Sequence, residues 1–317
     1  MKTFQTTLLA LTLLFSRPTF LPAAPAGQVI GWGGNEGGEA TGIPCSGSTN
    51  GVVTVAGQTL SNIVSVAGGS AHGLALTADG SVLGWGWNHD GQATVPAGLT
   101  NIAAIAAGEN YSLALKRDGT LVAWGNNGDY HLANVPVDLN NIVAISAGAT
   151  HVIALKNDGT VTGWGAPSTP AGLSNIAAVA AGSGYFSDNL ALKKDGTVIE
   201  WGANGIKRPV PAGLTNVVSI VAGENHCLAL NKKGIVKEWS NATAQSSEIL
   251  SNVTAIAAFA NFNLALKNDG TLVGWGYGRF YPRPIPVGLS NLVAMAVGGD
   301  FCLAITTNRA VAERFRH

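Results

Sequence analysis

The sequence is poor in charge and in cysteine. Asp, Glu, Lys and Arg together make up 11% of the 317 residues, and 18 basic side chains balance 18 acidic ones. A neutral chain lacks the basic surface that attracts nucleic acids or anionic membranes, so we expect neither as a partner. The three cysteines are an odd number, which argues against a disulfide framework.

The chain also lacks the pattern of an amphipathic helix. No window places apolar residues at i, i+3, i+4 and i+7 opposite a polar face, and 42 glycines would weaken any helix that contained them. Without a helix there is no phosphate loop between a strand and a helix, so the glycines serve turns. These absences favour an all-β fold.

No apolar run is long enough to span a bilayer. The run at residues 8–15 is far shorter than the roughly 20 residues that a spanning helix needs. Lys2 precedes it and the small residues 24–26 follow it, a pattern that predicts a secretory signal peptide over residues 1–26, with an uncleaved anchor as the alternative. We therefore expect a secreted or periplasmic protein that has no membrane contact after cleavage.

What the sequence does contain is one segment repeated seven times. Residues 101–125 read NIAAIAAGENYSLALKRDGTLVAWG, and close relatives of this string end at Trp32, Trp85, Trp124, Trp164, Trp201, Trp239 and Trp275. A period near 40 residues with several short strands is typical of a propeller blade of about four strands. We predict an all-β, seven-bladed β-propeller that forms a single domain over residues 27–317, with an insertion at about residues 45–58.

Each repeat predicts the strands of one blade. In the second unit we expect an inner strand at residues 102–107, a second at 112–116, an Asp118-Gly119 hairpin turn and a third at 120–124. The preceding unit predicts a fourth strand at residues 91–96, ending at a proline suited to an outer edge. In the insertion, residues 52–55 could add a short strand to a surface loop.

The two ends of the chain complement each other. The first Trp strand, residues 29–33, has no inner strand of its own, whereas the last inner strands, over residues 291–305, are followed by no Trp strand. We predict that the N-terminal strand completes the last blade, which closes the ring and removes exposed sheet edges.

The cysteines fit this arrangement. Cys227 and Cys302 occupy the same repeat position on separate blades, which predicts two small buried hydrophobic residues rather than a bridge. Cys45 lies in the insertion and is the one we would test as a free thiol.

The repeat motif A-A-G-x-x-(H/Y)-x-L-A-L-x-x-D-G-x-(V/L)-x-x-W-G resembles the regulator of chromosome condensation repeat family, whose members are seven-bladed propellers. The resemblance covers all of the mature chain. It is closest to the secreted bacterial branch, which includes a β-lactamase inhibitory protein, because both have a Trp-Gly-Gly-Asn strand (residues 32–35) followed by a G-x-A-T segment (residues 38–41). This resemblance implies a binding protein and makes a β-lactamase a candidate partner. The eukaryotic exchange-factor role does not fit a neutral chain with a signal peptide.

One face of such a propeller varies between repeats. The loops between the first and second strands and between the third and fourth strands share that face and hold all five tyrosines. Tyr and Trp are favoured at protein interfaces, so we predict that this face binds another protein. The predicted binding residues are Trp87, Tyr130, His131, Tyr185, Phe186, Tyr277, Phe280 and Tyr281. The opposite face repeats nearly the same residues and is predicted to be scaffold.

Some aromatic positions on the varied face have two interpretations. A ring of equivalent residues could either bind a partner or plug the ends of the blades. Its members are His72, Tyr111, His151, His226, Phe262 and Phe301. The inhibitor interpretation is weaker at the neighbouring positions Ala71, Asn110, Thr150 and Asn225, which are small or polar where aromatic anchors would be expected.

Catalysis has little support in the sequence. The repeat-equivalent histidines favour a structural role over metal binding, which needs converging ligands. The pair His89-Asp90 and the trio at residues 129–131 could act as acid or base, but no nucleophile accompanies them. We expect a monomeric, non-enzymatic protein-binding module without cofactor or metal. The alternatives are a β-lactamase inhibitor-like protein and a hydrolase or lyase with its site in the propeller mouth.

Overall fold

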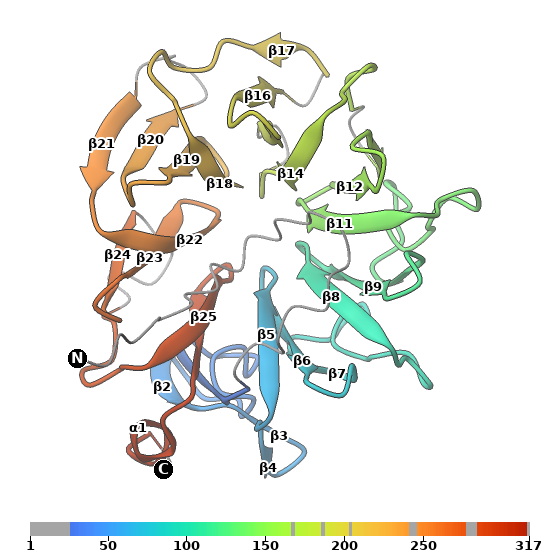
Figure 1. The fold of residues 1–317 in the computed structure, drawn as a ribbon. Coiled ribbons are helices and arrows are strands. Elements are labelled where there is room, and N and C mark those ends of the chain that lie inside the picture. The colour runs from blue at the N-terminus through green and yellow to red at the C-terminus, as the bar shows by residue number, and fades with distance from the viewer. Residues whose placement is uncertain are drawn as a thin grey trace, which may run out of the picture.

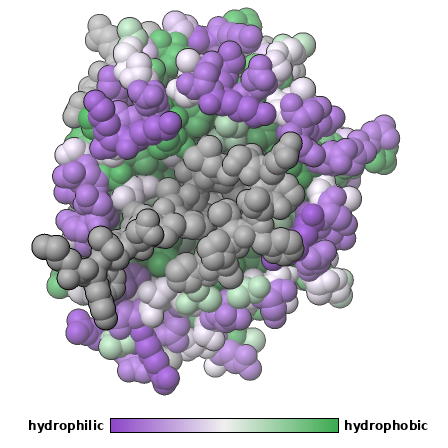
Figure 2. Space-filling model, in the orientation of Figure 1, coloured by the Kyte–Doolittle hydropathy of each residue, from purple (hydrophilic) through white to green (hydrophobic). Residues whose placement is uncertain are grey.

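The computed structural model describes residues 26–165, 169–184, 188–202, 205–240, 246–276 and 284–315. Across these residues the strands form eight antiparallel sheets, and seven of them are arranged as blades around a central axis (Figure 1). The first strand of each blade lies nearest the axis and later strands follow outward. The predicted seven-bladed β-propeller is confirmed. Hydrophilic residues gather along the rim of the face in view, with hydrophobic residues further inward (Figure 2).

The strands follow the repeats. Blade 1 contains β5 (Ile63–Gly68), β6 (His72–Thr77) and β7 (Val82–Gly86). Blade 2 contains β8 (Ile102–Ala107), β9 (Tyr111–Lys116) and β10 (Leu121–Gly125). Blade 3 contains β11 (Ile142–Ala147), β12 (His151–Lys156) and β13 (Val161–Gly165). Blade 4 contains β14 (Ile176–Ala180), β15 (Asn189–Lys193), β16 (Val198–Trp201) and β17 (Lys207–Arg208). Blade 5 contains β18 (Val217–Ala222), β19 (His226–Asn231), β20 (Val236–Ser240) and β21 (Ser246–Leu250). Blade 6 contains β22 (Val253–Phe259), β23 (Phe262–Lys267) and β24 (Leu272–Gly276).

The closing blade joins the two ends of the chain. Its order is β25 (Leu292–Val297), β26 (Phe301–Thr306), β1 (Gln28–Gly34) and β2 (Ser48–Val52). β1 pairs antiparallel with β26, and Trp32 lies opposite Cys302. The prediction that the N-terminal strand completes the last blade is confirmed. A short helix, α1 (Arg309–Glu313), follows β26.

One prediction about the outer strands is wrong, and the prediction of a short strand at residues 52–55 is incomplete. Residues 91–96 form no strand, and Pro96 at their end has no N–H with which to pair in a sheet. They still pack on the outside of β7, because a Cβ on Gly84 would lie 2.4 Å from the Ala93 carbonyl oxygen. The insertion does more than form a surface loop, because its residues 48–52 are β2, the outermost strand of the closing blade. The rest of it forms a two-stranded hairpin, β3 (Thr54–Val55) and β4 (Gln58–Thr59).

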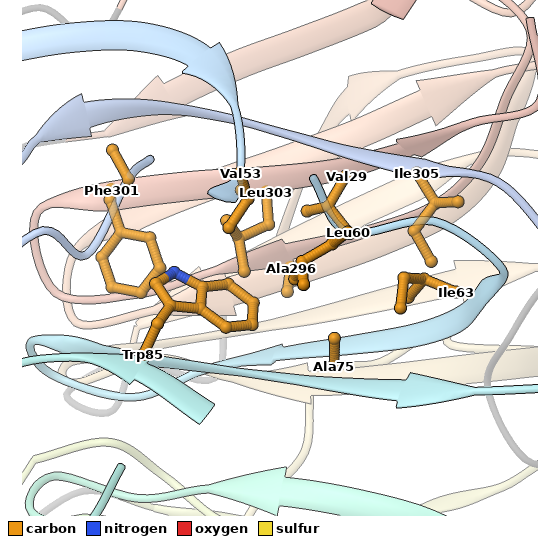
Figure 3. Close-up of a cluster of buried hydrophobic side chains, with 11 residues drawn as sticks. Val29, Val53, Leu60, Ile63, Ala75, Trp85, Ala296, Phe301, Leu303 and Ile305 are labelled. Carbon is orange, nitrogen blue, oxygen red and sulfur yellow. The ribbon is translucent and has the colours of Figure 1, made fainter. Parts of the chain in front are cut away.

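The hydrophobic core lies between neighbouring blades. Figure 3 shows Trp85 and Ala75 of blade 1 packed against Val29, Leu303 and Ile305 of the closing blade. Burying a side chain such as Ile or Leu contributes roughly 1.5–3 kcal/mol. Every blade shares such an apolar layer with its two neighbours. The stability of the ring therefore depends on all of these layers together.

The repeated tryptophans also link blades through their indole N–H groups. Trp85 Nε1 donates to the Glu39 carbonyl oxygen over 2.9 Å, and Trp124 Nε1 donates to the Gln92 carbonyl oxygen over 2.9 Å. Each acceptor belongs to the outer segment of the preceding blade. The regular spacing of the repeats therefore places each tryptophan both in its own strand and against the preceding blade.

The cysteine predictions agree with the structure. Cys227 and Cys302 are buried without a bridge, and Cys45 is exposed and free. Among the residues that the structure describes, no helix has the length and apolar character to cross a membrane.

Candidate functional site

The antiparallel blades give the ring two different faces. We call the face with the loops after the first and third strands of each blade the loop face. The opposite face, with the hairpin turns and the connections between blades, is the turn face. Of the residues predicted to bind a partner, Trp87, Tyr130 and His131 belong to the loop face.

A ring of buried side chains lies under the loop face. The Tyr111 hydroxyl donates to the carbonyl oxygens of Gly148 (3.0 Å) and His151 (2.7 Å) in the next blade. His151 Nε2 lies 2.5 Å from Asn189 Oδ1 of the following blade, and His226 Nε2 lies 2.7 Å from Asn263 Oδ1. These positions link consecutive blades.

The interpretation that these residues plug the blade ends is confirmed, and the binding interpretation is wrong for them. Tyr111 and His72 are fully buried, and His151, His226, Phe262 and Phe301 are also buried. Burial lowers the pKa of His72 to about 4, so its imidazole is neutral at pH 7, and burial raises the pKa of Tyr111. Side chains in this state hold the scaffold together and offer a partner no surface.

Three loops above this ring share one internal anchor. In the closing blade and in blades 1 and 2, the residue three positions after the repeat Trp is an asparagine: Asn35, Asn88 or Asn127. Asn35 Oδ1 accepts from the backbone N–H groups of Ala40 and Thr41. An anchor of this kind satisfies the loop backbone without a regular strand.

The anchors in the other two loops act in the same way. Asn88 Oδ1 accepts from Ala93 N over 2.8 Å, and Asn127 Oδ1 accepts from Ala133 N over 3.1 Å. The Asn88 amide also donates to Thr94 Oγ1. Three consecutive blades therefore carry loops of related, fixed shape.

These anchored loops expose large apolar side chains. Ile43 is 60% exposed, Trp87 52% and Tyr130 39%. Ile206, in the corresponding loop of blade 4, is also exposed. Among the described residues, the other exposed large hydrophobic side chains are Val137 and Val287 on the turn face. Aromatic and aliphatic surface thus concentrates on the loop face.

Neighbouring loops lie close to one another. A Cβ on Gly37 would lie 3.4 Å from Cε3 of Trp87, which brings the closing-blade loop against the indole of blade 1. A hollow of about 370 Å³ separates blades 2 and 3 on this face, and its lining includes Tyr130, His131 and Trp164. His131 has a φ of 51°, a left-handed conformation that is uncommon for a residue with a side chain.

Three of the eight predicted binding residues lie in the described part of the chain. Trp87, Tyr130 and His131 are exposed there, on adjacent blades. The other five, Tyr185, Phe186, Tyr277, Phe280 and Tyr281, lie outside the described residues. Sequence reasoning missed Ile43 and Ile206 because the search was for aromatic residues; their position in the loop after the repeat Trp could have identified them.

Within the described residues, the acid–base groups predicted from the sequence are not joined by a nucleophile or a metal site. His89 Nδ1 lies 3.6 Å from Asp90 Oδ1 on an exposed loop, as a pair without a further group. No set of three His, Cys, Asp or Glu side chains in the described ranges is arranged to hold a metal ion.

One buried cluster of charge belongs to blade 4 and supports the structure there. Arg208 donates to Asp188 over 2.7 Å, and Trp239 Nε1 donates to Glu200 Oε2 over 2.7 Å. Burial raises the pKa of Glu200 to about 7, the charge of Asp188 acts in the same direction, and the indole hydrogen bond opposes both.

A closed ring of seven repeated blades, with anchored and variable loops on one face, defines a repeat β-propeller. Three of its repeats, at residues 63–92, 102–130 and 142–168, match the regulator of chromosome condensation (RCC1) repeat. These matches lie in blades 1 to 3.

Solved structures with this fold come from distant organisms. Human WBSCR16 has a TM-score of 0.70 at 19% identity, covering 89% of this chain and 99% of that one. Yeast RCC1 (Prp20), solved with Kap60, has a TM-score of 0.72 at 18% identity, covering 92% of each chain. The CRINKLY WD40 ectodomain of the Arabidopsis thaliana receptor kinase ACR4 has a TM-score of 0.62 at 20% identity, covering 77% of this chain and 93% of that one. Likeness at such identities concerns the fold alone. The comparison with curated proteins found no match.

Proposed function

We propose that this protein is a non-enzymatic binding module that recognises another protein through the loop face. The observation that carries the proposal is the row of exposed apolar side chains, Ile43, Trp87 and Tyr130, on three consecutive blades whose loops share an asparagine anchor. A grouped apolar surface of this kind is typical of an interaction site.

The anchored loops favour tight binding. A loop whose backbone is already hydrogen-bonded loses little entropy when a partner settles on it. Trp and Tyr bury much area for few rotatable bonds and often dominate interface energies. Trp87 and Tyr130 are therefore the anchors of the proposed interface, and Ile43 belongs to the neighbouring loop of the closing blade.

Relatives in fold are consistent with a protein partner. Yeast RCC1 was solved with Kap60 bound, and a structure of Prp20p from Saccharomyces cerevisiae was described with its binding properties to Gsp1p and histones. Those partners belong to those proteins. The neutral charge of this chain favours a partner other than histones.

The N-terminal segment supports a secreted or periplasmic location. A short apolar run after Lys2, followed by small residues, is the pattern of a cleaved signal peptide. We propose that the monomeric propeller meets its partner outside the cytoplasm.

A β-lactamase is the specific alternative for that partner. The observation that favours it is the segment at residues 32–41, which resembles the start of the bacterial β-lactamase inhibitory protein. Within this segment, Asn35 donates to the Ile43 carbonyl oxygen and anchors that loop. Inhibition of a panel of β-lactamases at nanomolar concentration would select this alternative, and no inhibition across the panel would eliminate it.

The general proposal is tested by capture with matched variants. The protein is used as bait on the periplasm or medium of the organism that makes it. The Trp87→Ala/Tyr130→Ala variant should lose the captured protein, whereas Val137→Ala/Val287→Ala, which removes exposed apolar side chains from the turn face, should retain it. Equal capture by both variants would refute the choice of face.

A further inference from the structure

The turn face contains a cavity. It measures about 1060 Å³ and lies among blades 2 to 5. Its floor comes from the innermost strands, through Ala103, Val143, Ala177 and Val218, and its rim comes from the hairpin turns. Small-molecule sites are typically apolar hollows of roughly 300–1,000 Å³ with a few polar groups, so this volume is sufficient for a ligand.

The floor residues sit at a backbone irregularity that the whole ring repeats. The register between the first and second strands shifts between Ile102 and Ala104 and between Ile142 and Ala144, and the same shift recurs in the other five blades. A bulge leaves a residue outside the ladder and turns its side chain. In blades 2 to 5 the skipped residue lines the cavity.

The rim of this cavity is cationic although the whole chain is neutral. Five basic side chains line it: Lys116, Arg117, Lys193, Lys194 and Lys232. Two acidic side chains, Asp118 and Asp195, also line it, which leaves a net charge of +3. The whole sequence has 18 basic and 18 acidic residues.

The two carboxylates are already engaged in their turns. Asp118 Oδ1 accepts from the Thr120 backbone and hydroxyl, and Asp195 Oδ1 accepts from the same groups of Thr197. By contrast, none of the five cationic groups forms a hydrogen bond or ion pair with another residue in the portion of the chain that is described. The rim therefore has cationic groups available to an anion.

The repeat produces only part of this charge, because the position of Lys116 is also lysine in blades 3, 4 and 6. The next position is basic in blades 2, 4 and 5 alone, as Arg117, Lys194 and Lys232. These three residues all line the cavity, and Lys194 Nζ reaches to 3.5 Å from where a Cβ on Gly159 of blade 3 would lie.

We propose that this cavity is a second binding site, separate from the loop face, that takes an amphiphilic organic anion: an acidic head group held by the lysines and Arg117 over an apolar body on the bulged strand residues. Charge-assisted contacts at the rim select the head group, and burial of apolar surface on Ala103, Val143, Ala177 and Val218 holds the body. The site depends on the propeller fold and is independent of any protein partner.

The probe for this site is 8-anilinonaphthalene-1-sulfonate, a sulfonate with an aromatic body. A fluorescence titration of the purified protein should show one saturable site, whose affinity falls about tenfold or more in Lys193→Glu/Lys194→Glu. The matched control is Lys267→Glu, the same repeat position on blade 6, which does not line the cavity and should bind like the wild type. The neutral probe N-phenyl-1-naphthylamine should bind equally to all three proteins.

Hydrogen exchange of the wild type keeps the test independent of how the variants fold. Bound sulfonate should slow exchange at residues 116–119 and 193–196 and leave residues 87–93 unchanged. Absence of saturable binding, equal sulfonate affinity in the double variant, or protection confined to the loop face would each overturn the proposal. None of these results bears on capture of a protein by the loop face, so the two proposals fail separately.

Discussion

At the scale of single residues, the ring is held by buried polar groups that each reach the next blade. Tyr111 is the clearest case, because one fully buried hydroxyl lies within hydrogen-bonding distance of two carbonyl oxygens of blade 3. Its equivalents are histidines in three other blades. Their burial makes them part of the scaffold, which a sequence pattern of aromatic and polar residues could not distinguish from a binding ring.

Tyr111→Phe should lower the free energy of unfolding by about 1–3 kcal/mol, since it removes the Tyr111 donor from the Gly148 carbonyl oxygen, whereas the His151 oxygen still accepts from the Gly148 N–H. Denaturant unfolding measures the change. Tyr130→Phe is the matched control, because Tyr130 is exposed, and it should leave stability within about 0.5 kcal/mol of the wild type. Equal effects of the two substitutions would show that the buried hydroxyl does not link the blades.

Glu200 predicts a pH dependence of stability. Its pKa in the folded protein is raised to about 7 from an ordinary value of 4.5, so between these two values the folded state binds more protons than the unfolded state. The free energy of unfolding contributed by Glu200 therefore falls as pH rises from about 4.5 to 7 and is level above that range. The loss is on the order of 1–3 kcal/mol.

Glu200→Gln should remove this fall while keeping an oxygen acceptor for Trp239. Chemical denaturation of both proteins between pH 4.5 and 8 measures the difference. His72, whose pKa burial lowers to about 4, has the opposite slope below pH 6.5 in both proteins and cancels in the comparison. Glu238→Gln changes the acceptor of Trp275 outside the Asp188 cluster and serves as the control. Parallel profiles for wild type and Glu200→Gln would contradict the assignment.

At the scale of elements, the inner strands and the closure of the ring could be predicted from the sequence, whereas the outer edges could not. Inner strands repeat a strong apolar pattern that ends in a Gly turn or a Trp, and β1 has one place to pair because it lacks an inner strand of its own. Outer segments such as residues 91–96 are short and polar and end in a proline. Their sequence pattern therefore does not decide whether they form a hydrogen-bonded strand.

Removal of residues 27–41 should destabilise the whole ring. The deletion takes β1 from between β26 and β2, which leaves two unpaired edges and opens the apolar layer around Val29. Thermal unfolding followed by circular dichroism should show one transition at a clearly lower temperature. An unchanged melting temperature would contradict closure by the N-terminal strand.

Gly31→Ala is a milder version of the same test. An added Cβ would lie 1.8 Å from the Ala40 carbonyl oxygen, so β1 or the adjoining loop must shift, at a cost of roughly 1–3 kcal/mol. Gly128→Ala is the matched control, since the nearest atom to its added Cβ is Asn126 Oδ1 at 3.3 Å, on an exposed loop. A larger loss of stability in Gly128→Ala would argue against tight packing around β1.

At the scale of the whole molecule, the existence of two faces can be predicted from one antiparallel repeat. The repeat does not predict what each face binds. Departures from the repeat predicted Trp87, Tyr130 and His131 as binding residues. Exposed Ile43 was not predicted, because the prediction was based on aromatic side chains. The cavity on the turn face could not be predicted, because Arg117, Lys194 and Lys232 lie far apart in sequence. They line one cavity because the blades that hold them are arranged in a ring. Repetition of the turns suggested scaffold, although the charges beside them differ between blades.

Binding of a protein partner at the loop face can be measured by hydrogen exchange of the captured complex, compared with the free propeller. We expect slower exchange at residues 35–47, 87–93 and 126–134, which belong to the three anchored loops, and no change in the hairpin turns at residues 116–119 and 193–196. Protection of those turns with unchanged exchange in the anchored loops would contradict it.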